Sequence, residues 1–272
     1  MKKKNLSIYF IGRRQGHDWY KYIPSKIENT RKDEDIGLKN TDYLSRTYFK
    51  NSSDIIFFRN KPEKTSDKIV KSLKSELINV KDKLVINDIR SFYNYDSKNR
   101  TFKIWKENDL FCPEFISFSK DDINYNNQII EKISNFLKIH KKIILRTNNE
   151  TGSRGLYVID NINQIGSIIE KLKKRMNKLL GNRIDTNIMC VEYLETKDEK
   201  GYRDLYRVHV LFDKILCYYV SSSKQNILYN SLMSKTEINR FIEKNYEFSI
   251  LLPKIKNEII KSVKVLGNNI GA

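Results

Sequence analysis

The chain has 272 residues, of which 39% are hydrophobic and 11% aromatic, and this composition excludes an intrinsically disordered protein. The 51 Lys and Arg residues outnumber 33 Asp and Glu residues, which gives a net charge of +18. Such a charge attracts polyanions, but the lysines are scattered and Asn, Ile and Tyr are also abundant. We therefore favour an AT-rich coding sequence over a dedicated nucleic-acid-binding face as the explanation.

The first part of the chain predicts a small α/β unit, because short apolar runs alternate with one helical stretch. The expected strands are 6–11, 54–58 and 83–87, and the expected helix is 62–79. The apolar stripe of this helix consists of Ile69, Val70, Leu73, Leu77 and Ile78. Residues 13–50 are polar and give no assignment.

The rest of the chain predicts more helices and strands in alternation. The expected strands are 114–118, 142–146, 156–159 and 188–194, followed by a hairpin of 206–211 and 215–220. The expected helices are 100–108, one capped by Asp121 or Asp122 that runs through Leu137, 163–180, 235–246 and 253–267. We expect three domains, 1–95, 96–195 and 196–272.

Three widely spaced cysteines, Cys112, Cys190 and Cys217, form no CxxC pair, and the three histidines have no metal-ligand spacing. A disulfide framework and a zinc site are therefore not expected, and the predicted compartment is the reducing cytoplasm. No apolar run approaches the roughly 20 residues that span a bilayer. The apolar run near the N-terminus ends at Arg13 and Arg14 without a cleavage signal, so we do not interpret it as a signal peptide.

The segment 142–160, KIILRTNNETGSRGLYVID, is the most informative part of the sequence. A strand ends in a cation, Arg146, and a loop containing Gly152, Ser153 and Gly155 follows it. Glycines allow close backbone approach, and successive N–H groups suit phosphate oxygens. The loop has neither GK[ST] nor GxGxxG, and a loop of this kind, taken alone, is most often an ordinary hairpin turn.

Three further segments accompany this loop in a particular order. The first, VINDIRSFYNYDSKNRTFKIWKENDLFCPEF, contains Asn87, Lys98 after Ser97, and Pro113. The second is IMCVEYL and the third is LYRVHVLFDKI. In this order, residues 84–272 resemble the ATP-grasp superfamily of carboxylate–amine and carboxylate–thiol ligases, in particular its glutathione synthetase-like and ribosomal-protein-modification branch.

The resemblance implies an ATP-grasp fold of α+β lobes, an α/β architecture preceded by a small N-terminal α/β domain. It also implies that ATP phosphorylates a carboxylate, and that an amine or a thiol then attacks the acyl phosphate. The implied ATP-binding residues are Lys98 and Arg146 for α- and β-phosphate, Gly152, Ser153 and Gly155 for the β/γ end, Glu192, Tyr193 and Leu194 for adenine, and Glu199 for ribose. Arg207 is implied to be catalytic and to stabilise the transferring phosphoryl group, Asp204 is the rival of Glu199, and Asn230 occupies a polar position after the returning strand.

The family uses two Mg²⁺ ions, held by acidic residues and an Asn on strands near the C-terminus. The chain stops at Ala272 without these strands, so we expect no metal ligands within it. We favour a piece of a longer enzyme, and the alternative is a catalytically incomplete nucleotide-binding module.

Each site residue also has a plain structural interpretation. Lys98 and Arg207 could be solvated cations, Glu192 could be a charge at a strand edge, and His209 is expected to be a packed strand residue. The expected partners are ATP and an unidentified carboxylate and amine, without a membrane, and nucleic acid is the least favoured partner.

Overall fold

The computed structural model describes residues 6–12, 36–41, 55–59, 65–78, 83–119, 121–122, 126–150, 154–180, 183, 185–224, 235–267 and 270–271. The chain divides into two compact units, Met1–Phe92 and Tyr93–Ala272. The predicted three-domain division remains a prediction. No helix in the described ranges has the length and apolarity that crossing a bilayer requires.

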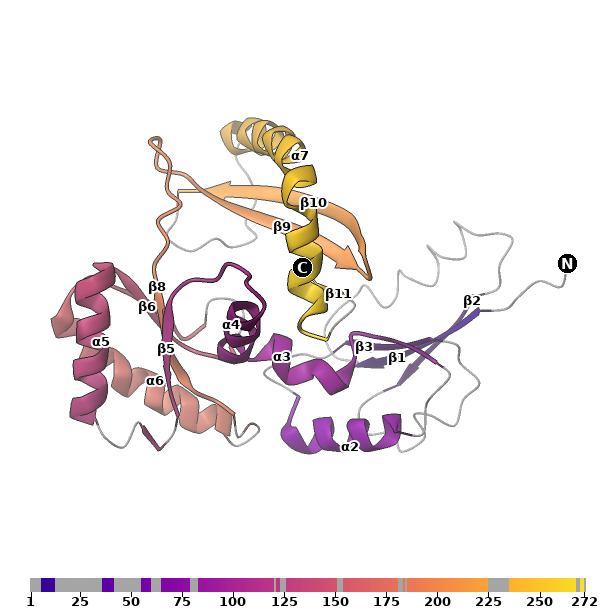
Figure 1. Ribbon diagram of the computed structural model, residues 1–272, viewed down its shortest axis with the longest axis horizontal. Helices are drawn as coiled ribbons and strands as arrows, with labels where there is room; N and C mark the ends of the chain where they lie inside the picture. Colours follow the sequence, from indigo (N-terminus) through magenta and orange to yellow (C-terminus); the bar gives the residue numbers. More distant parts are fainter. Residues whose placement is uncertain are drawn as a thin grey trace, which may run out of the picture. The chain divides into compact units, whose positions relative to one another are not determined.

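The first unit contains a parallel sheet with the strand order β2-β1-β3-β4 (Figure 1). Its elements are β1 (Leu6–Gly12), β2 (Ile36–Thr41), β3 (Ile55–Arg59), α2 (Asp67–Leu77), β4 (Leu84–Ile86) and η2 (Ile89–Ser91). Three of the predicted strands are confirmed, whereas β2 lies in a segment whose polar sequence gave no strand signal.

Helix α2 connects the parallel neighbours β3 and β4, as a βαβ unit requires. Its buried stripe consists of Val70, Leu73 and Leu77. The predicted burial of Ile78 is wrong, because the helix ends at Leu77 and the Ile78 side chain is 71% exposed. Pro62, the expected helix start, lies outside the described residues.

The second unit begins with a four-stranded sheet in the order β5-β8-β6-β7 (Figure 1). Its elements are α3 (Phe92–Asp96), α4 (Lys98–Glu107), β5 (Phe115–Phe118), α5 (Asn126–His140), β6 (Ile143–Thr147), β7 (Leu156–Ile159), η4 (Ile162–Gln164), α6 (Ile165–Leu180) and β8 (Ile188–Glu192). Asp122 is not seen capping α5; it accepts hydrogen bonds from Ser119 N and Oγ, both at 2.7 Å.

The two faces of this sheet carry different side chains because successive residues of a strand point to opposite faces. Ile143, Leu145 and Cys190 lie in the apolar core with the inner faces of α5 and α6. Their neighbours Ile144 and Arg146 point to the opposite face, which α4 approaches (Figure 1). The core therefore fixes one face of the sheet and leaves the other available for a site.

The chain ends in an antiparallel hairpin packed against a long helix. The elements are β9 (Arg203–Leu211), β10 (Lys214–Ser223), α7 (Lys235–Lys264) and β11 (Ile270–Gly271), which pairs with β9. The predicted hairpin is confirmed, with Phe212 in its turn at a positive φ of 56°. Asn245 of α7 accepts from Val220 N and donates to Val220 O, at 3.1 and 3.2 Å.

The prediction of two C-terminal helices is wrong, since α7 is continuous and contains Pro253. Its C-terminal part also contacts α4, because Trp105 Nε1 donates to Ser262 O at 2.9 Å and Lys261 Nζ donates to Asn108 O at 2.6 Å. These contacts connect the final helix to the element that carries Lys98.

Candidate nucleotide-binding site

A cavity of about 260 Å³ lies on the face of the sheet opposite α5 and α6. Helix α4, strands β6 and β8, and the residues that follow β8 surround it. The lining residues are Lys98, Phe102, Pro113, Ile144, Arg146, Met189, Val191, Glu192, Tyr193 and Leu194. Five residues proposed from the sequence therefore lie around one cavity, namely Lys98, Arg146, Glu192, Tyr193 and Leu194.

Local periodicity explains this convergence. Ile144 and Arg146 are two residues apart on β6, and Met189 and Val191 are two residues apart on β8, so all four share one face. Arg146 is also paired with Met189 in the antiparallel register. Phe102 follows Lys98 by one helical turn on α4 and lines the same cavity.

Two cations meet at one end of the cavity. Lys98 Nζ donates to the backbone oxygen of Glu150 at 3.0 Å, and Arg146 Nη2 donates to the same oxygen at 2.9 Å. Arg146 Nε also donates to Thr147 O at 3.1 Å. Burial lowers the pKa of Arg146 to about 10, which still leaves the guanidinium charged at neutral pH.

Glu150 was not predicted as a site residue, and hydrogen bonds hold its side chain in place. Its buried carboxylate accepts from Thr147 Oγ1 at 2.7 Å and from Arg175 Nε at 3.0 Å, and Arg175 Nη2 completes a bidentate pair. Burial acts to raise the pKa of the Glu150 carboxyl, but the hydrogen bonds from Arg175 and Thr147 hold it below its ordinary value. Helix α6 thereby anchors the loop that carries the shared oxygen.

Gly155 lies against this carboxylate. It is buried with φ +62°, and a Cβ there would overlap Oε2 of Glu150 and lie 2.9 Å from Arg175 Nε. A glycine is therefore required both by the backbone conformation and by the close approach of Glu150. Gly152 and Ser153, the other loop residues of the prediction, lie outside the described residues.

A buried polar network around Asn148 holds the backbone of Lys98 in place at the start of α4. Asn148 O accepts from Lys98 N at 3.2 Å, and Asn148 Nδ2 donates to Ser97 Oγ at 2.8 Å. Asn187 N donates to Asn148 Oδ1 at 2.8 Å, which ties the same residue to the start of β8. The start of α4 and the loop after β6 are thus positioned together.

The other end of the cavity is formed by the residues after β8. The N–H groups of Glu192 and Tyr193 donate to Glu114 O and Lys142 O, at 2.9 and 3.2 Å. The Glu192 carboxylate is turned to the sheet edge, where its Oε2 accepts from Glu114 N at 3.2 Å. Leu194, which follows them, is another lining residue, and its N–H donates to no described residue.

Tyr193 is fixed by charged neighbours. Lys142 Nζ lies 4.2 Å from the centre of its ring, and Arg203 Nε donates to its hydroxyl at 3.1 Å. Glu195 pairs with both cations, at 3.7 Å from Lys142 Nζ and 3.2 Å from Arg203 Nη2. This group joins Lys142, the residue before β6, to the first residue of β9 beside the cavity.

Arg207 and Glu199 do not line the cavity. Arg207 lies on β9, with its guanidinium 5.9 Å from the centre of the Tyr219 ring. Because it alternates in step with Arg203, it shares the face of β9 that reaches Tyr193. Glu199 is exposed in the loop before β9.

The rival of Glu199, Asp204, accepts from Arg240 Nη2 at 2.8 and 2.9 Å and therefore already has a structural partner. Asn230 lies outside the described residues. In the described parts of the chain, no cluster of three or more His, Cys, Asp or Glu side chains is arranged to hold a metal ion. The described residues therefore provide no set of ligands that fits the Mg²⁺ ions implied by the resemblance.

Comparison with known proteins decides the fold. No protein-family model and no curated protein sequence matches the chain. A D-alanine–D-alanine ligase from Bacillus anthracis complexed with ATP superposes with a TM-score of 0.55 and 12% identity over 98% of this chain and 78% of that one. The chain has the ATP-grasp fold.

Two other structures show the same ATP-grasp fold. The ATP-grasp ligase PsnB, complexed with a minimal precursor, has a TM-score of 0.55 and 12% identity over 98% of this chain and 84% of its own. A RimK domain ATP-grasp protein from Sphaerobacter thermophilus has a TM-score of 0.53 and 10% identity, over 97% and 83%. The resemblance inferred from the sequence is confirmed at the level of the fold.

The sequence interpretation did not predict the apolar wall of the cavity, although its signal was present. Ile144, Met189 and Val191 follow from the period of two that places Arg146 on that face. Phe102 follows from its spacing to Lys98. Glu150 and Arg175 have no such signal, because they lie on a loop and a helix with no shared period.

Proposed function

We propose that this protein binds ATP in the cavity between α4, β6 and β8 and uses it as an ATP-grasp ligase. The reaction would join a carboxylate to an amine, or to a thiol, through an acyl phosphate. The observation that carries the proposal is the meeting of Lys98 and Arg146 at one end of an otherwise largely apolar cavity. A cationic end and an apolar end match the two ends of a nucleotide.

The apolar end suits adenine. Phe102, Met189 and Leu194 supply apolar surface there, and the main-chain N–H of Leu194 would donate to a ring nitrogen. The volume of about 260 Å³ lies just below the roughly 300–1,000 Å³ typical of small-molecule sites. This is consistent with a cavity that encloses the base while the phosphates extend towards the cations.

The cationic end suits the phosphates. Lys98 and Arg146 would neutralise charge on the α- and β-phosphates, and the loop of Gly152, Ser153 and Gly155 would cover the β/γ end. Arg207 would approach the transferring phosphoryl group, and Glu199 would bind ribose. Cationic clamps of this kind contribute several kcal/mol to phosphoryl transfer.

The proposed chemistry has two balanced steps. A carboxylate oxygen attacks the γ-phosphorus, the bond to the β–γ bridging oxygen breaks, and ADP leaves. The amine nitrogen then attacks the acyl carbon, releases inorganic phosphate and loses a proton. The structural neighbours supporting this class are named as ligases, and one was crystallised with ATP. The ATP-grasp fold also implies Mg²⁺, but neither of these two steps is assigned to the ion.

Calorimetric titration with ATP tests the site. Ile144→Trp would fill the cavity and is expected to abolish binding, whereas Ile116→Trp, a half-buried isoleucine on the other face of the sheet, serves as the matched control. Retention of ATP affinity in Ile144→Trp would overturn the assignment. ADP formation that requires both a carboxylate and an amine tests the ligase reaction; ATP binding without it would indicate the nucleotide-binding module.

A further inference from the structure

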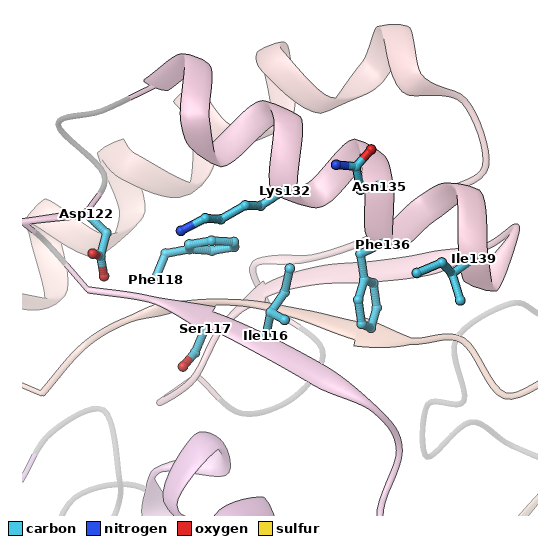
Figure 2. A pocket seen from close by; sticks show the side chains of 8 residues that line it. All are labelled: Ile116, Ser117, Phe118, Asp122, Lys132, Asn135, Phe136 and Ile139. Carbon is cyan, nitrogen blue, oxygen red and sulfur yellow. The ribbon is translucent and has the colours of Figure 1, made fainter.

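A second cavity, of about 480 Å³, lies on the opposite face of the same sheet, between β5 and α5 (Figure 2). It shares no lining residue with the proposed ATP cavity. From β5 it is lined by Ile116, Ser117 and Phe118, and from α5 by Lys132, Asn135, Phe136 and Ile139. We call this cavity the β5–α5 groove.

Strand β5 borders the groove and is the end strand of its sheet among the described strands. Glu192 N donates to Glu114 O at 2.9 Å, and in an antiparallel pair the hydrogen-bonded residues alternate. Ile116 and Phe118 therefore bond to β8. The N–H and C=O groups of Phe115 and Ser117 point to the outer edge, where the described part of the chain supplies no strand.

Helix α5 lies over β5 on the groove side of the sheet (Figure 2). Lys132, Phe136 and Ile139 recur at helical spacing on the side that lines the groove. Figure 2 shows Phe136 and Ile139 descending from α5 towards β5, with Ile116 and Phe118 pointing up from the strand and Ser117 pointing away. The Ile139 side chain is 74% exposed. The arrangement leaves apolar surface where one further strand would lie.

The charge of the groove indicates what such a strand would carry. Lys132 reaches across the Phe118 ring towards Asp122 (Figure 2). The Asp122 carboxylate is already occupied by Ser119 N and Oγ, and those hydrogen bonds are the main reason that its pKa is lowered. Lys132 makes no hydrogen bond or close ion pair with a described residue, although its charge contributes to the lowered pKa of Asp122. Its ammonium can therefore attract an incoming carboxylate as well.

We propose that the β5–α5 groove binds an extended peptide segment of a partner protein, added as a strand to the outer edge of β5. Main-chain hydrogen bonds to Phe115 and Ser117 would provide affinity, and alternate side chains would enter the groove. The segment carries apolar residues at alternate positions, with an acidic residue opposite Lys132. The net charge of +18 favours an acidic partner over a basic one. This inference does not depend on ATP binding.

Fluorescence anisotropy with the full chain tests the proposal. The probe is a short fluorescein-labelled peptide that alternates threonine with valine and has glutamate in place of one central valine. Saturable binding is expected, together with its loss when alternate backbone nitrogens of the peptide are methylated. Absence of binding, or equal binding of the methylated peptide, would overturn the proposal.

Protein variants locate the peptide. Ile139→Asp is expected to abolish binding, whereas Ile162→Asp, which changes another exposed isoleucine of the same unit, is expected to leave it unchanged. Lys132→Glu should weaken the glutamate peptide about fivefold and strengthen a matched lysine peptide by a similar factor. Unaltered affinity in Lys132→Glu and Ile139→Asp would contradict the proposal. Concentration-dependent dimers that Ile139→Asp dissolves would identify a second copy as the occupant and overturn it.

Discussion

Lys98 and Arg146 donate to one oxygen, the main-chain carbonyl of Glu150, although they lie on different elements 48 residues apart in the sequence. Two cations this close repel each other, and carbonyl dipoles offset only part of that repulsion. A bound anion would stabilise the pair much more. The shared oxygen therefore lies next to the phosphate position that we propose.

The first prediction concerns ATP affinity. Lys98→Ala and Arg146→Ala should each weaken binding about tenfold or more, because a hydrogen bond to a charged group contributes about 1.5–3 kcal/mol. Calorimetric titration provides the measurement. Lys103→Ala, an exposed lysine on the same helix, is the control and should bind ATP normally.

The double variant adds a sharper test. Since the two cations share one acceptor, their effects should be non-additive, with a coupling of about 0.5 kcal/mol or more. Unchanged ATP affinity in both single variants would remove the assignment of the cavity's cationic end.

Much of this site could be predicted from the sequence because it follows from periodicity. The strand ending in Arg146 and the strand leading to Tyr193 are short apolar runs, and their lengths fix which side chains share a face. The order of motifs supplied Lys98. Arg207 was predicted to lie on a strand, and it lies on β9. The distance of its side chain from the cavity depends on how the hairpin packs relative to the four-stranded sheet, which no local sequence pattern encodes.

The Glu150–Arg175 pair and the continuity of α7 could not be predicted for a different reason. Tertiary contacts determine both. A loop glutamate in a lysine-rich chain looks like any solvated acid, and only the fold brings Arg175 to it. Pro253 signals a helix end, yet packing on β10 at one end and on α4 at the other maintains the helix through it.

The second prediction concerns Gly155. Gly155→Ala should destabilise the protein by more than about 2 kcal/mol, because its φ of +62° is unfavourable for alanine and the new Cβ would displace the Glu150 carboxylate. Urea unfolding measures the effect. The matched control is Gly166→Ala in α6, where nothing lies within 4 Å of the added Cβ.

Gly166→Ala should stabilise the helix by about 0.5–1 kcal/mol, since alanine loses less backbone entropy than glycine. Opposite signs for the two substitutions are therefore expected. An equal, small effect at both positions would show that Gly155 is not constrained by Glu150.

The third prediction concerns acid stability. The folded-state pKa of Glu150 lies below its unfolded value of about 4.3, so the carboxylate contributes stability that is fully present above about pH 4.3. That contribution is lost as the pH falls through the lower, folded pKa. Glu150→Gln should therefore be less stable than the natural protein at pH 7 and should lose less stability on acidification.

Urea midpoints measured from pH 7 down to pH 3 provide the comparison. The difference between the natural protein and Glu150→Gln should shrink as the pH falls. A difference that is constant over this range would show that the loss in the variant comes from packing rather than from the ionised carboxylate.

The last prediction concerns the attachment of α7 to the hairpin. Arg240 Nη2 pairs with both Asp204 oxygens at 2.8 and 2.9 Å, and Nη1 lies 2.8 Å from Asp198 Oδ2. Its guanidinium also lies 4.7 Å from the centre of the Tyr202 ring. The Arg240 side chain is only 10% exposed, and Arg240→Ala leaves Asp204 without its main partner. The substitution should therefore cost about 2–3 kcal/mol, the scale of hydrogen bonds to charged groups.

Lys244→Ala is the matched control on the same helix. Lys244 pairs with the exposed Glu247 at 2.6 Å, and solvent-exposed pairs contribute only about 0–1 kcal/mol. Thermal and urea unfolding should therefore separate the two variants clearly. Similar stabilities for Arg240→Ala and Lys244→Ala would mean that apolar packing, for example of Phe248 on Tyr206 and Tyr218, is enough to hold α7 on the hairpin without the ion pairs.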